Sequence, residues 1–272
     1  GEELAQKDIY SILDILYRDP KAPLGAKLAI VEGKAEDIIH MKTIKETLLT
    51  EAISDLLVTA EDNTIIENET VQTVCPIMFD PSADFSLPVI KMIETNDIEV
   101  VGMGLISDRT YTGVTLDAEH STTLLMLANK KAKVAQVNMM VHPDEENPQN
   151  RYMTLSISKA KSKITTTVNS PTDIQVKIDM KVTGAIAEYP KNHLVNKQKV
   201  KVLEEKAAQY LTTQSEEVIK IIQDADSDVL KIGQQVKAHH NKTWKDIKWR
   251  EVYPTIEIVP NVTVEITGTG II

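Results

Sequence analysis

The feature of the sequence that most constrains the fold is a pair of long segments in which apolar and polar residues alternate strictly. The first is "RYMTLSISKAKSKITTTV" at 151–168, and the second is "DIQVKIDMKVTGAIAEY" at 173–189. Alternation with a period of two places the apolar side chains on one face of a strand. The pattern therefore predicts two long strands with one wet face and one packed face, the packed residues being Leu155, Ile157, Ile174, Val176, Ile178, Met180 and Val182.

The segments after these strands have helical periodicity, and the helices they predict can pack against the apolar face of the sheet. The longest predicted helix covers 197–225, and a second covers 227–240. A last strand is predicted over 255–272, with Pro260 marking a bend or an edge. Together these segments predict an α+β fold, in which an antiparallel or mixed β-sheet packs against long C-terminal helices.

A smaller, mainly helical region precedes this sheet. We expect a helix that starts near Asp8 and stops at Pro20, because the residue before a proline is pushed out of the helical region. Other segments with clear periodicity are a strand at 26–31 and helices at 35–39 and 43–61. The prolines between 63 and 97 indicate a loop-like boundary.

Strand periodicity begins after this boundary. Strands at 98–107 and 110–116 are joined by Asp108-Arg109, a link of hairpin length. Asp117 is placed to cap a helix over 118–130, and a further strand is predicted over 132–141.

The net charge, the cysteine count and the lengths of the apolar runs limit the kinds of partner and site that the protein can have. The 272 residues include 30 basic and 40 acidic side chains, which gives a formal net charge of -10. Such a chain is repelled by nucleic acid and by anionic lipid unless it has a local basic patch, so no nucleic-acid partner is expected. Cys75 is the single cysteine, so no intrachain disulfide can form, and we expect it to be a small buried apolar residue. No run of about 18 apolar residues predicts a membrane-spanning helix.

The sequence shows no pattern that assembles a catalytic, metal or cofactor site. Gly33 follows an apolar strand but lacks the further glycines of a phosphate-binding loop. "GMG" at 102–104 lies inside a strand pattern, which favours a bulge or a tight packing point. Trp244 and Trp249 are expected to bury apolar area where the last helix meets the sheet, with ligand stacking as the alternative. We therefore expect no cofactor, no metal and no enzyme activity.

Two short basic clusters remain, at 130–133 and 159–163. The second alternates along a strand, so it places Lys159, Lys161 and Lys163 on one exposed face or edge. These lysines either block edge-to-edge pairing of strands or form a docking face for an acidic partner.

Two further segments are candidate contact surfaces. One is the polar loop at 142–150, and the other is the corner at Arg18 and Asp19, where the first long helix ends. Arg18 and Asp19 have a structural alternative, because they can pair with each other or cap the helix end.

Four blocks of the sequence resemble the Ger(x)C family, the C subunits of bacterial spore germinant receptors. The blocks begin "GEELAQKDIYSILDILYRDP", "IEVVGMGLISDRTYTGVTLDAEH", "VTGAIAEY" and "DADSDVLKIGQQVKAHHNKTWKDIKW". The last block is the most specific, since Asp228, Gly233, Trp244 and Trp249 stand as in the family's C-terminal block. The resemblance covers nearly the whole chain.

The resemblance implies three domains and a location. It divides the chain into the remainder of a first domain at 1–33, a mainly helical second domain at 34–96, and a third domain at 97–272. Family members begin with a lipoprotein signal and a lipid-modified cysteine. Neither is present here, and Cys75 lies in mid-chain, so we expect a C-terminal portion of such a protein.

The resemblance also implies a function. The protein would be held by an N-terminal lipid at the outer face of the spore inner membrane, with integral-membrane A and B subunits as partners. It would act without catalysis in a receptor that responds to small nutrients and triggers germination. The alternative is that it binds the germinant directly, which the low aromatic content of 4% disfavours.

Overall fold

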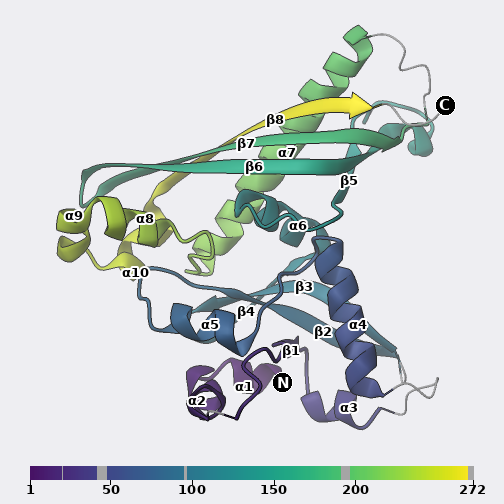
Figure 1. The fold of residues 1–272 in the computed structure, drawn as a ribbon. Helices are drawn as coiled ribbons and strands as arrows, with labels where there is room; N and C mark the ends of the chain where they lie inside the picture. Colours follow the sequence, from purple (N-terminus) through teal and green to yellow (C-terminus); the bar gives the residue numbers. More distant parts are fainter. Residues whose placement is uncertain (20, 42–47, 95–96, 191–196, 269–272) are drawn as a thin grey trace.

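Two four-stranded sheets organise the part of the chain that the computed structural model describes, which is residues 1–19, 21–41, 48–94, 97–190 and 197–268 (Figure 1). The strand orders are β1-β2-β3-β4 and β5-β6-β7-β8. Several expectations fall outside these residues: the helix stop at Pro20, the start of the helix at 43–61, the boundary at 96 and the last four residues of the predicted final strand.

The first sheet combines a short parallel strand with an antiparallel meander. Its strands are β1 (Ile30–Val31), β2 (Ser86–Glu94), β3 (Asp97–Ser107) and β4 (Thr110–Asp117). β1 runs parallel to β2, and the other pairs are antiparallel. The predicted hairpin link is confirmed, since Asp108 and Arg109 both have positive φ, at 44° and 68°.

Helices pack on both faces of the first sheet. They are α1 (Glu2–Ala5), α2 (Tyr10–Arg18), α3 (Ala35–Ile39), α4 (Leu49–Asp62) and α5 (Val71–Met78). One apolar cluster joins α2 and α5 to Leu87 and Val89 of β2, and contains Cys75, which is buried as expected. A second cluster joins α3 and α4 to Ile90 and Met103. The side chains of β2 therefore pack into two different apolar clusters, one on each face of the sheet.

The second sheet is built on the long hairpin that the alternating pattern predicts. Its strands are β5 (Gln136–Met140), β6 (Tyr152–Ser170), β7 (Asp173–Glu188) and β8 (Glu257–Gly268), with β8 parallel to β7. α7 (Lys197–Asp224) packs against the sheet, and its stripe residues Leu203, Ala207 and Leu211 are buried in the same core. The α+β prediction of a mixed sheet packed on a long C-terminal helix is confirmed.

A central helix, α6 (Ala118–Leu127), joins the two sheets into one core. It contacts β3 and β4 of the first sheet, β6 and β7 of the second, and α7. Every residue from Ser121 to Leu127 is buried, which explains why α6 lacks a polar face. Asp117 caps it as predicted, accepting a hydrogen bond of 2.9 Å from the His120 backbone N–H.

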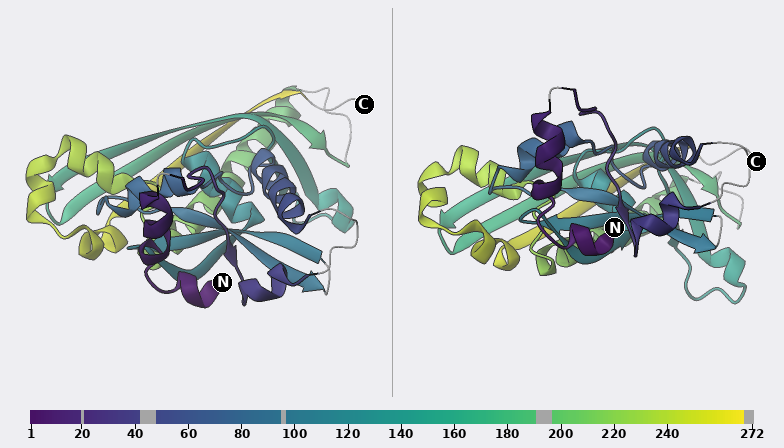
Figure 2. Two further views of the ribbon diagram at one scale, coloured as in Figure 1. Left: turned by 60° about the horizontal axis from the view of Figure 1, so that its bottom comes forward. Right: turned by 90° about the horizontal axis from the view of Figure 1, so that it is seen from below.

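Small elements lie at both ends of the second sheet. η1 (Pro148–Arg151) precedes β6 at one end. At the other end, four elements lead into β8: α8 (Ile232–His239), α9 (Asn241–Asp246), α10 (Trp249–Val252) and η2 (Tyr253–Thr255). In both views of Figure 2, α8 and α9 lie at one end of the molecule and the end of β8 lies at the other. The helix predicted over 227–240 begins only at Ile232, because Lys231, directly before it, has a positive φ of 58°.

Two readings of the N-terminal half were wrong. The segment 63–97, read as loop-like from its prolines, contains α5 and β2. α5 begins with a capping box between Thr70 and Thr73 and holds Pro76 inside it. The strand predicted at 26–31 is regular only at 30–31, with an isolated bridge between Lys27 and Thr70.

The "GMG" segment is both a bulge and a close packing point, as predicted. The pairing of β2 with β3 shifts register next to Gly102. Gly102 has φ +150°, and a Cβ there would lie 2.0 Å from the Leu116 carbonyl oxygen. The strands approach this closely only without a side chain.

The three-domain division at 33/34 and 96/97 stays a prediction. The first sheet does not follow it, since β1 precedes the first boundary while β2 and β3 lie on opposite sides of the second.

Candidate functional site

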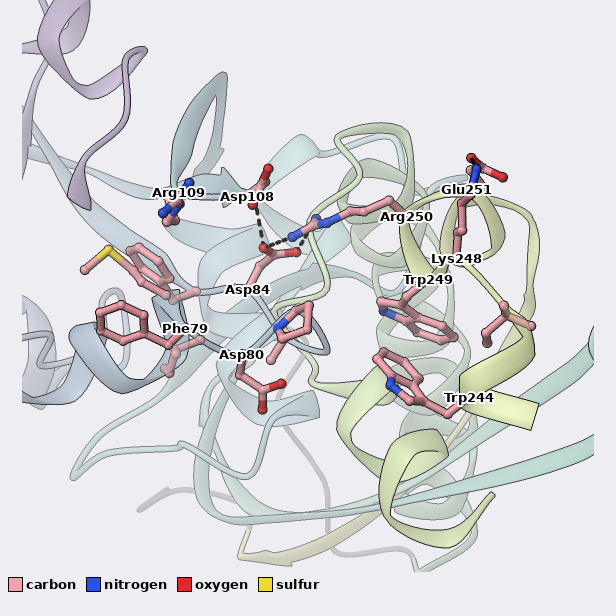
Figure 3. A pocket seen from close by; sticks show the side chains of 16 residues that line it. Phe79, Asp80, Asp84, Asp108, Arg109, Trp244, Lys248, Trp249, Arg250 and Glu251 are labelled. Carbon is pink, nitrogen blue, oxygen red and sulfur yellow. Dashed lines mark hydrogen bonds and ion pairs between the residues drawn. The ribbon is translucent and has the colours of Figure 1, made fainter. Parts of the chain in front are cut away.

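A pocket of about 540 Å³ opens where the loop after α5 faces α9 and α10 (Figure 3). One wall comes from residues 77–85, beside the first sheet, and the other from residues 244–251. The β3–β4 turn at Asp108 and Arg109 completes the lining. The two walls are more than 150 residues apart in sequence, so the pocket exists only because the two sheets are held together.

Aromatic side chains line both walls. Figure 3 shows Phe79 on one side and Trp244 and Trp249 on the other, with Asp80 and Asp84 between them. The rings of Trp244 and Trp249 lie 5.7 Å apart between centroids, and Tyr10 contacts Phe79 edge-on at 5.1 Å. Trp249 is buried where the last helices meet the sheet core, as expected, whereas Trp244 is only partly buried.

An ion pair between the buried Asp84 and the partly buried Arg250 lines the pocket. The Arg250 guanidinium donates to both carboxylate oxygens of Asp84, over 2.7 Å from Nη1 and 2.5 Å from Nη2. The same Nη1 donates to the Ser107 hydroxyl and the Asp226 carbonyl. Burial alone would lower the pKa of Arg250, but the hydrogen bonds and charge of Asp84, with Asp226 and Asp108, raise it. Asp84 also accepts from the backbone N–H of Asp228 at 2.8 Å, so this pair ties the first sheet to the second.

Three of the four residues that mark the most specific block, Asp228, Gly233 and Trp249, meet in one place. The Asp228 carboxylate accepts hydrogen bonds from Gly233 N–H at 2.7 Å and from Trp249 Nε1–H at 3.0 Å. A Cβ on Gly233 would lie 2.6 Å from Trp249 Nε1 and 2.7 Å from the Ser82 carbonyl oxygen. Burial raises the pKa of Asp228 to about 7, although these N–H groups oppose the shift. Asp228 and Gly233 therefore hold α8 against the Trp249 indole ring and the loop at Ser82.

Asp80 ties the same loop to α8. Its carboxylate accepts hydrogen bonds from Ser82, from Gln234 Nε2 at 3.0 Å and from Lys237 Nζ at 2.9 Å. Burial alone would raise the pKa of Asp80, but these hydrogen bonds outweigh it and lower the pKa to about 2. Asp80 and Asp84 thus both have protein partners.

None of the predicted partner-surface lysines lines this pocket. Lys159, Lys161 and Lys163 are exposed on the open face of β6. Lys161 stands opposite Lys181 of β7, which pairs with Glu265 of β8 at 2.8 Å. Among the described residues, the three β6 lysines have no ion-pair partner within 4 Å.

The structure also brings the two basic clusters of the sequence together. The Asn129 side chain bonds the Ser162 backbone twice, donating to its carbonyl and accepting from its N–H, each at 2.7 Å. Lys133 of the first cluster pairs with Asp62, while Lys131 donates only to nearby backbone carbonyls. Cluster 130–133 therefore borders the edge of the strand that carries 159–163.

Arg18 and Asp19 are not brought to these lysines, because they end α2 beside the first sheet. Arg18 Nε donates to Asp14 at 2.6 Å, and the Asp19 carboxylate accepts from the Lys21 backbone N–H at 2.9 Å. The two residues do not pair with each other, and each has a local structural contact.

Reasoning from the sequence missed the Asp84–Arg250 pair and the aromatic walls. Asp84 stands in a segment read as loop, 166 positions from its partner. The one available signal was the place of Arg250, directly after Trp249 in the most specific block. Within the described residues, no group of three or more histidine, cysteine, aspartate or glutamate side chains is placed to hold a metal ion.

Comparison with known proteins gives consistent matches. The family model described as "Spore germination B3/ GerAC like, C-terminal" matches residues 101–270, and "Spore germination protein N-terminal domain" matches residues 1–92. YfkR of Bacillus subtilis (strain 168), named as a spore germination protein, is 26% identical over 137 residues. That match covers 48% of this chain and about a third, 34%, of the relative.

A solved structure supports the fold. The crystal structure of the GerBC protein superposes with a TM-score of 0.75, covering 98% of this chain and 77% of that chain. The sequence identity is 16%, so this match shows a shared fold.

Proposed function

Because the chain belongs to the GerAC-like family of spore germination proteins, we propose that it is a non-enzymatic subunit of a nutrient germinant receptor. Its role is assembly with the integral-membrane A and B subunits. The acids at and beside the pocket support this proposal, since Asp80, Asp84 and Asp228 are all engaged in hydrogen bonds that hold the fold.

The observation that carries the proposal is the open face of β6, β7 and β8. Lys159, Lys161 and Lys163 form a column of exposed cations on a chain with a net charge of -10. A rigid strand holds alternate side chains about 7 Å apart, so the column presents fixed charges to a partner. An acidic surface on a membrane subunit is complementary to it. The corner at Arg18 and Asp19 is a secondary candidate for the same role.

We place the protein at the outer face of the spore inner membrane, held by a lipid anchor. No helix among the described residues is long and apolar enough to cross a membrane. The net charge of -10 opposes adsorption on anionic lipid, so stable residence on the membrane calls for an acyl chain or a bound subunit.

Affinity capture tests the proposal. The native protein, tagged at its C-terminus and crosslinked in dormant spores, is purified from the spore membranes, and the co-purified proteins are identified. We expect integral-membrane receptor subunits in the eluate and none in an eluate from an untagged strain. Recovery of the tagged protein without these subunits would contradict assembly.

A second candidate function, direct binding of a small germinant, is favoured by the pocket of about 540 Å³. This volume lies within the usual range for small-molecule sites. Thermal unfolding in the presence of amino acids, sugars and nucleosides tests it, because a ligand of the folded state raises the melting temperature. A panel without any stabilising compound at millimolar concentration would remove this candidate.

A further inference from the structure

One edge of the second sheet is open along the second half of β6. β5 pairs with β6 only at residues 152–156, and the hairpin of β6 and β7 extends beyond β5 toward α8 and α9 (Figure 1). The open stretch begins after Ser162, whose backbone N–H and C=O are both bonded by the Asn129 side chain. It ends at the register shift between Val168 and Ser170.

The backbone of this stretch carries hydrogen-bonding groups that point away from β7. The N–H and C=O of Ser162 face away from β7, and no register shift separates Ser162 from Val168. Because backbone groups alternate in direction along a strand, those of Ile164, Thr166 and Val168 also face outward. Within the described chain, no hydrogen bond reaches these outward groups. They therefore form an unpaired strand edge.

The opposite edge of the same sheet has two protective features. In β8, the outward N–H of Ile266 donates to the Glu204 carboxylate of α7 at 2.8 Å. Pro260 lies an even number of positions before Ile266 in the same strand, so it faces the same way and offers no N–H. Residues 164–168 of β6 have neither feature. They are one isoleucine, three threonines and one valine, which favour strand structure and carry no charge.

The two faces of the open stretch differ in chemistry. On the inner face, Ile164 and Val168 pack against the core to which α8 contributes. On the outer face, the exposed threonines at 165 and 167 continue the column of β6 lysines (the lysine column). Asp179 lies opposite Lys163 but already has an ion-pair partner on its own strand. An added strand would therefore meet apolar side chains on one face and positive charge on the other.

We infer that β6 accepts an extended segment of a partner protein as a further strand along residues 163–169. Main-chain hydrogen bonds to Ile164, Thr166 and Val168 hold the segment, as in other cases of strand addition at a sheet edge. Its inner side chains are small or apolar, and its outer side chains are acidic beside Lys163, where the lysine column attracts negative charge. This strand addition rests on the proposed function, because it describes the part of the partner that the lysine column receives.

A second copy of this chain fits the edge less well. Each chain has a net charge of -10, so two copies repel each other. A pair of strands of this length also buries much less than the roughly 800 Å² per partner of a standard interface. An acidic segment of a different protein is attracted by the lysine column, and the rest of that protein can add contact area.

A synthetic peptide tests strand addition on the purified chain. The probe is the capped heptapeptide Thr-Val-Thr-Val-Glu-Val-Glu, which places its last glutamate beside Lys163 when it pairs antiparallel to β6. The matched control peptide has lysine in place of both glutamates. We expect saturable binding of the probe in calorimetry, and at least about tenfold weaker binding of the control peptide. Equal binding of the two peptides, or no binding of the probe, would overturn the inference.

Hydrogen exchange locates the bound peptide. With saturating probe, the amides of Ile164, Thr166 and Val168 should exchange at least about tenfold more slowly, because they then donate to the peptide. The outward amides of Val262 and Val264 on the other edge are internal controls and should exchange as before. Binding that leaves the three β6 amides unprotected would contradict strand addition.

A proline variant blocks the edge. Thr166→Pro removes the central outward N–H without taking a donor from the β6–β7 ladder, so the chain should still fold. We expect at least about tenfold weaker binding of the probe, whereas Thr166→Val, which retains the N–H, should bind as the parent chain does. Equal binding by the two variants would show that the edge is not the site. Should Thr166→Pro not fold, the exchange measurement decides alone.

Crosslinking in spores separates strand addition from the proposed function. We expect Thr166→Pro to recover at least about tenfold fewer integral-membrane receptor subunits than Thr166→Val does. Equal recovery by both would leave assembly standing and remove strand addition. Recovery of no subunits by the parent chain would overturn the proposed function, and strand addition to its partner with it. A parent chain that sediments as a dimer, with a monomeric Thr166→Pro, would show that the edge binds a second copy and would also overturn the inference.

Discussion

At the scale of single residues, we expect the Asp84–Arg250 ion pair to contribute strongly to the stability of the contact between the two sheets. The Asp84 side chain is 4% exposed, and both of its oxygens accept from the guanidinium. A buried carboxylate that loses its cation keeps the cost of its desolvation. We therefore expect the loss of either partner to destabilise the folded protein.

Arg250→Ala should lower the free energy of unfolding by about 3 kcal/mol, because it leaves Asp84 buried and unpaired. Urea unfolding followed by far-UV circular dichroism measures this loss. Lys248→Ala, two positions away, removes an ion pair whose side chains are 79% and 69% exposed, and should leave the free energy of unfolding nearly unchanged. Similar losses in the two variants would show that the Arg250 pair does not hold the junction.

The raised pKa of Asp228 predicts that the free energy of unfolding depends on pH. Its folded-state pKa is raised by burial to about 7, from an ordinary value of 3.8. Between about pH 4 and pH 7 the unfolded chain has released this proton while the folded chain retains it, so the free energy of unfolding falls as the pH rises.

Asp228→Asn removes this titration, and its unfolding free energy should fall less steeply between about pH 4 and pH 7 than that of the parent chain. Its stability should be lower throughout, because an amide offers one acceptor oxygen to the N–H groups of Ile232, Gly233 and Trp249. Urea unfolding at a series of pH values measures both effects, and parallel curves would contradict the assignment.

At the scale of elements, the position of α8 depends on how closely its backbone approaches Trp249 and the loop at Ser82. An apolar stripe on the helix matters less. Gly233 lies in the first turn of α8, against the Trp249 ring and the Ser82 carbonyl. A side chain at this position has no free space, so the helix would have to move away from the loop at residues 80–82.

Gly233→Ala should therefore destabilise the protein by about 2 kcal/mol, even though alanine favours helix by about 1 kcal/mol over glycine. Gly25→Ala is the matched control, because a Cβ there meets no atom within 4 Å. The control should change stability by less than about 0.5 kcal/mol. Thermal unfolding of both variants checks the prediction, and a neutral Gly233→Ala would show that α8 is loosely seated.

The same elements show where sequence patterns succeed and fail. β6, β7 and α7 were predicted nearly to their ends, because alternation and helical periodicity over 16 or more residues leave few alternatives. α5 and β2 were missed because Pro76 and Pro88 read as loop signals. Pro76 lies inside α5, where it lacks the N–H for one helical hydrogen bond, and Pro88 lies in a strand that β1 joins only at Val89 and Ile90.

At the scale of the whole molecule, the candidate site could not be predicted from the sequence. Local patterns report which face of an element is apolar, but they do not report which polar residues meet across 150 or more positions. Asp84 and Arg250 pair only because α6 holds the two sheets together. Alternation alone does not place the lysine column, because Leu155 and Ile157 precede it at the same period and are buried. The register shift between Ile157 and Lys159 moves Lys159, Lys161 and Lys163 to the open face.

The central claim, assembly through the lysine column, is tested most directly by charge reversal. The variant Lys159→Glu, Lys161→Glu, Lys163→Glu is compared with Lys197→Glu, Lys199→Glu, Lys201→Glu on α7, which has the same change in net charge. Both should unfold at the temperature of the parent chain, because all six side chains are exposed.

The measurement is the amount of integral-membrane receptor subunits recovered with each crosslinked variant from spore membranes. The account predicts at least about tenfold less recovery with the β6 variant and unchanged recovery with the α7 variant, since like charges at a docked surface cost several kcal/mol. Equal recovery with both folded variants would contradict it.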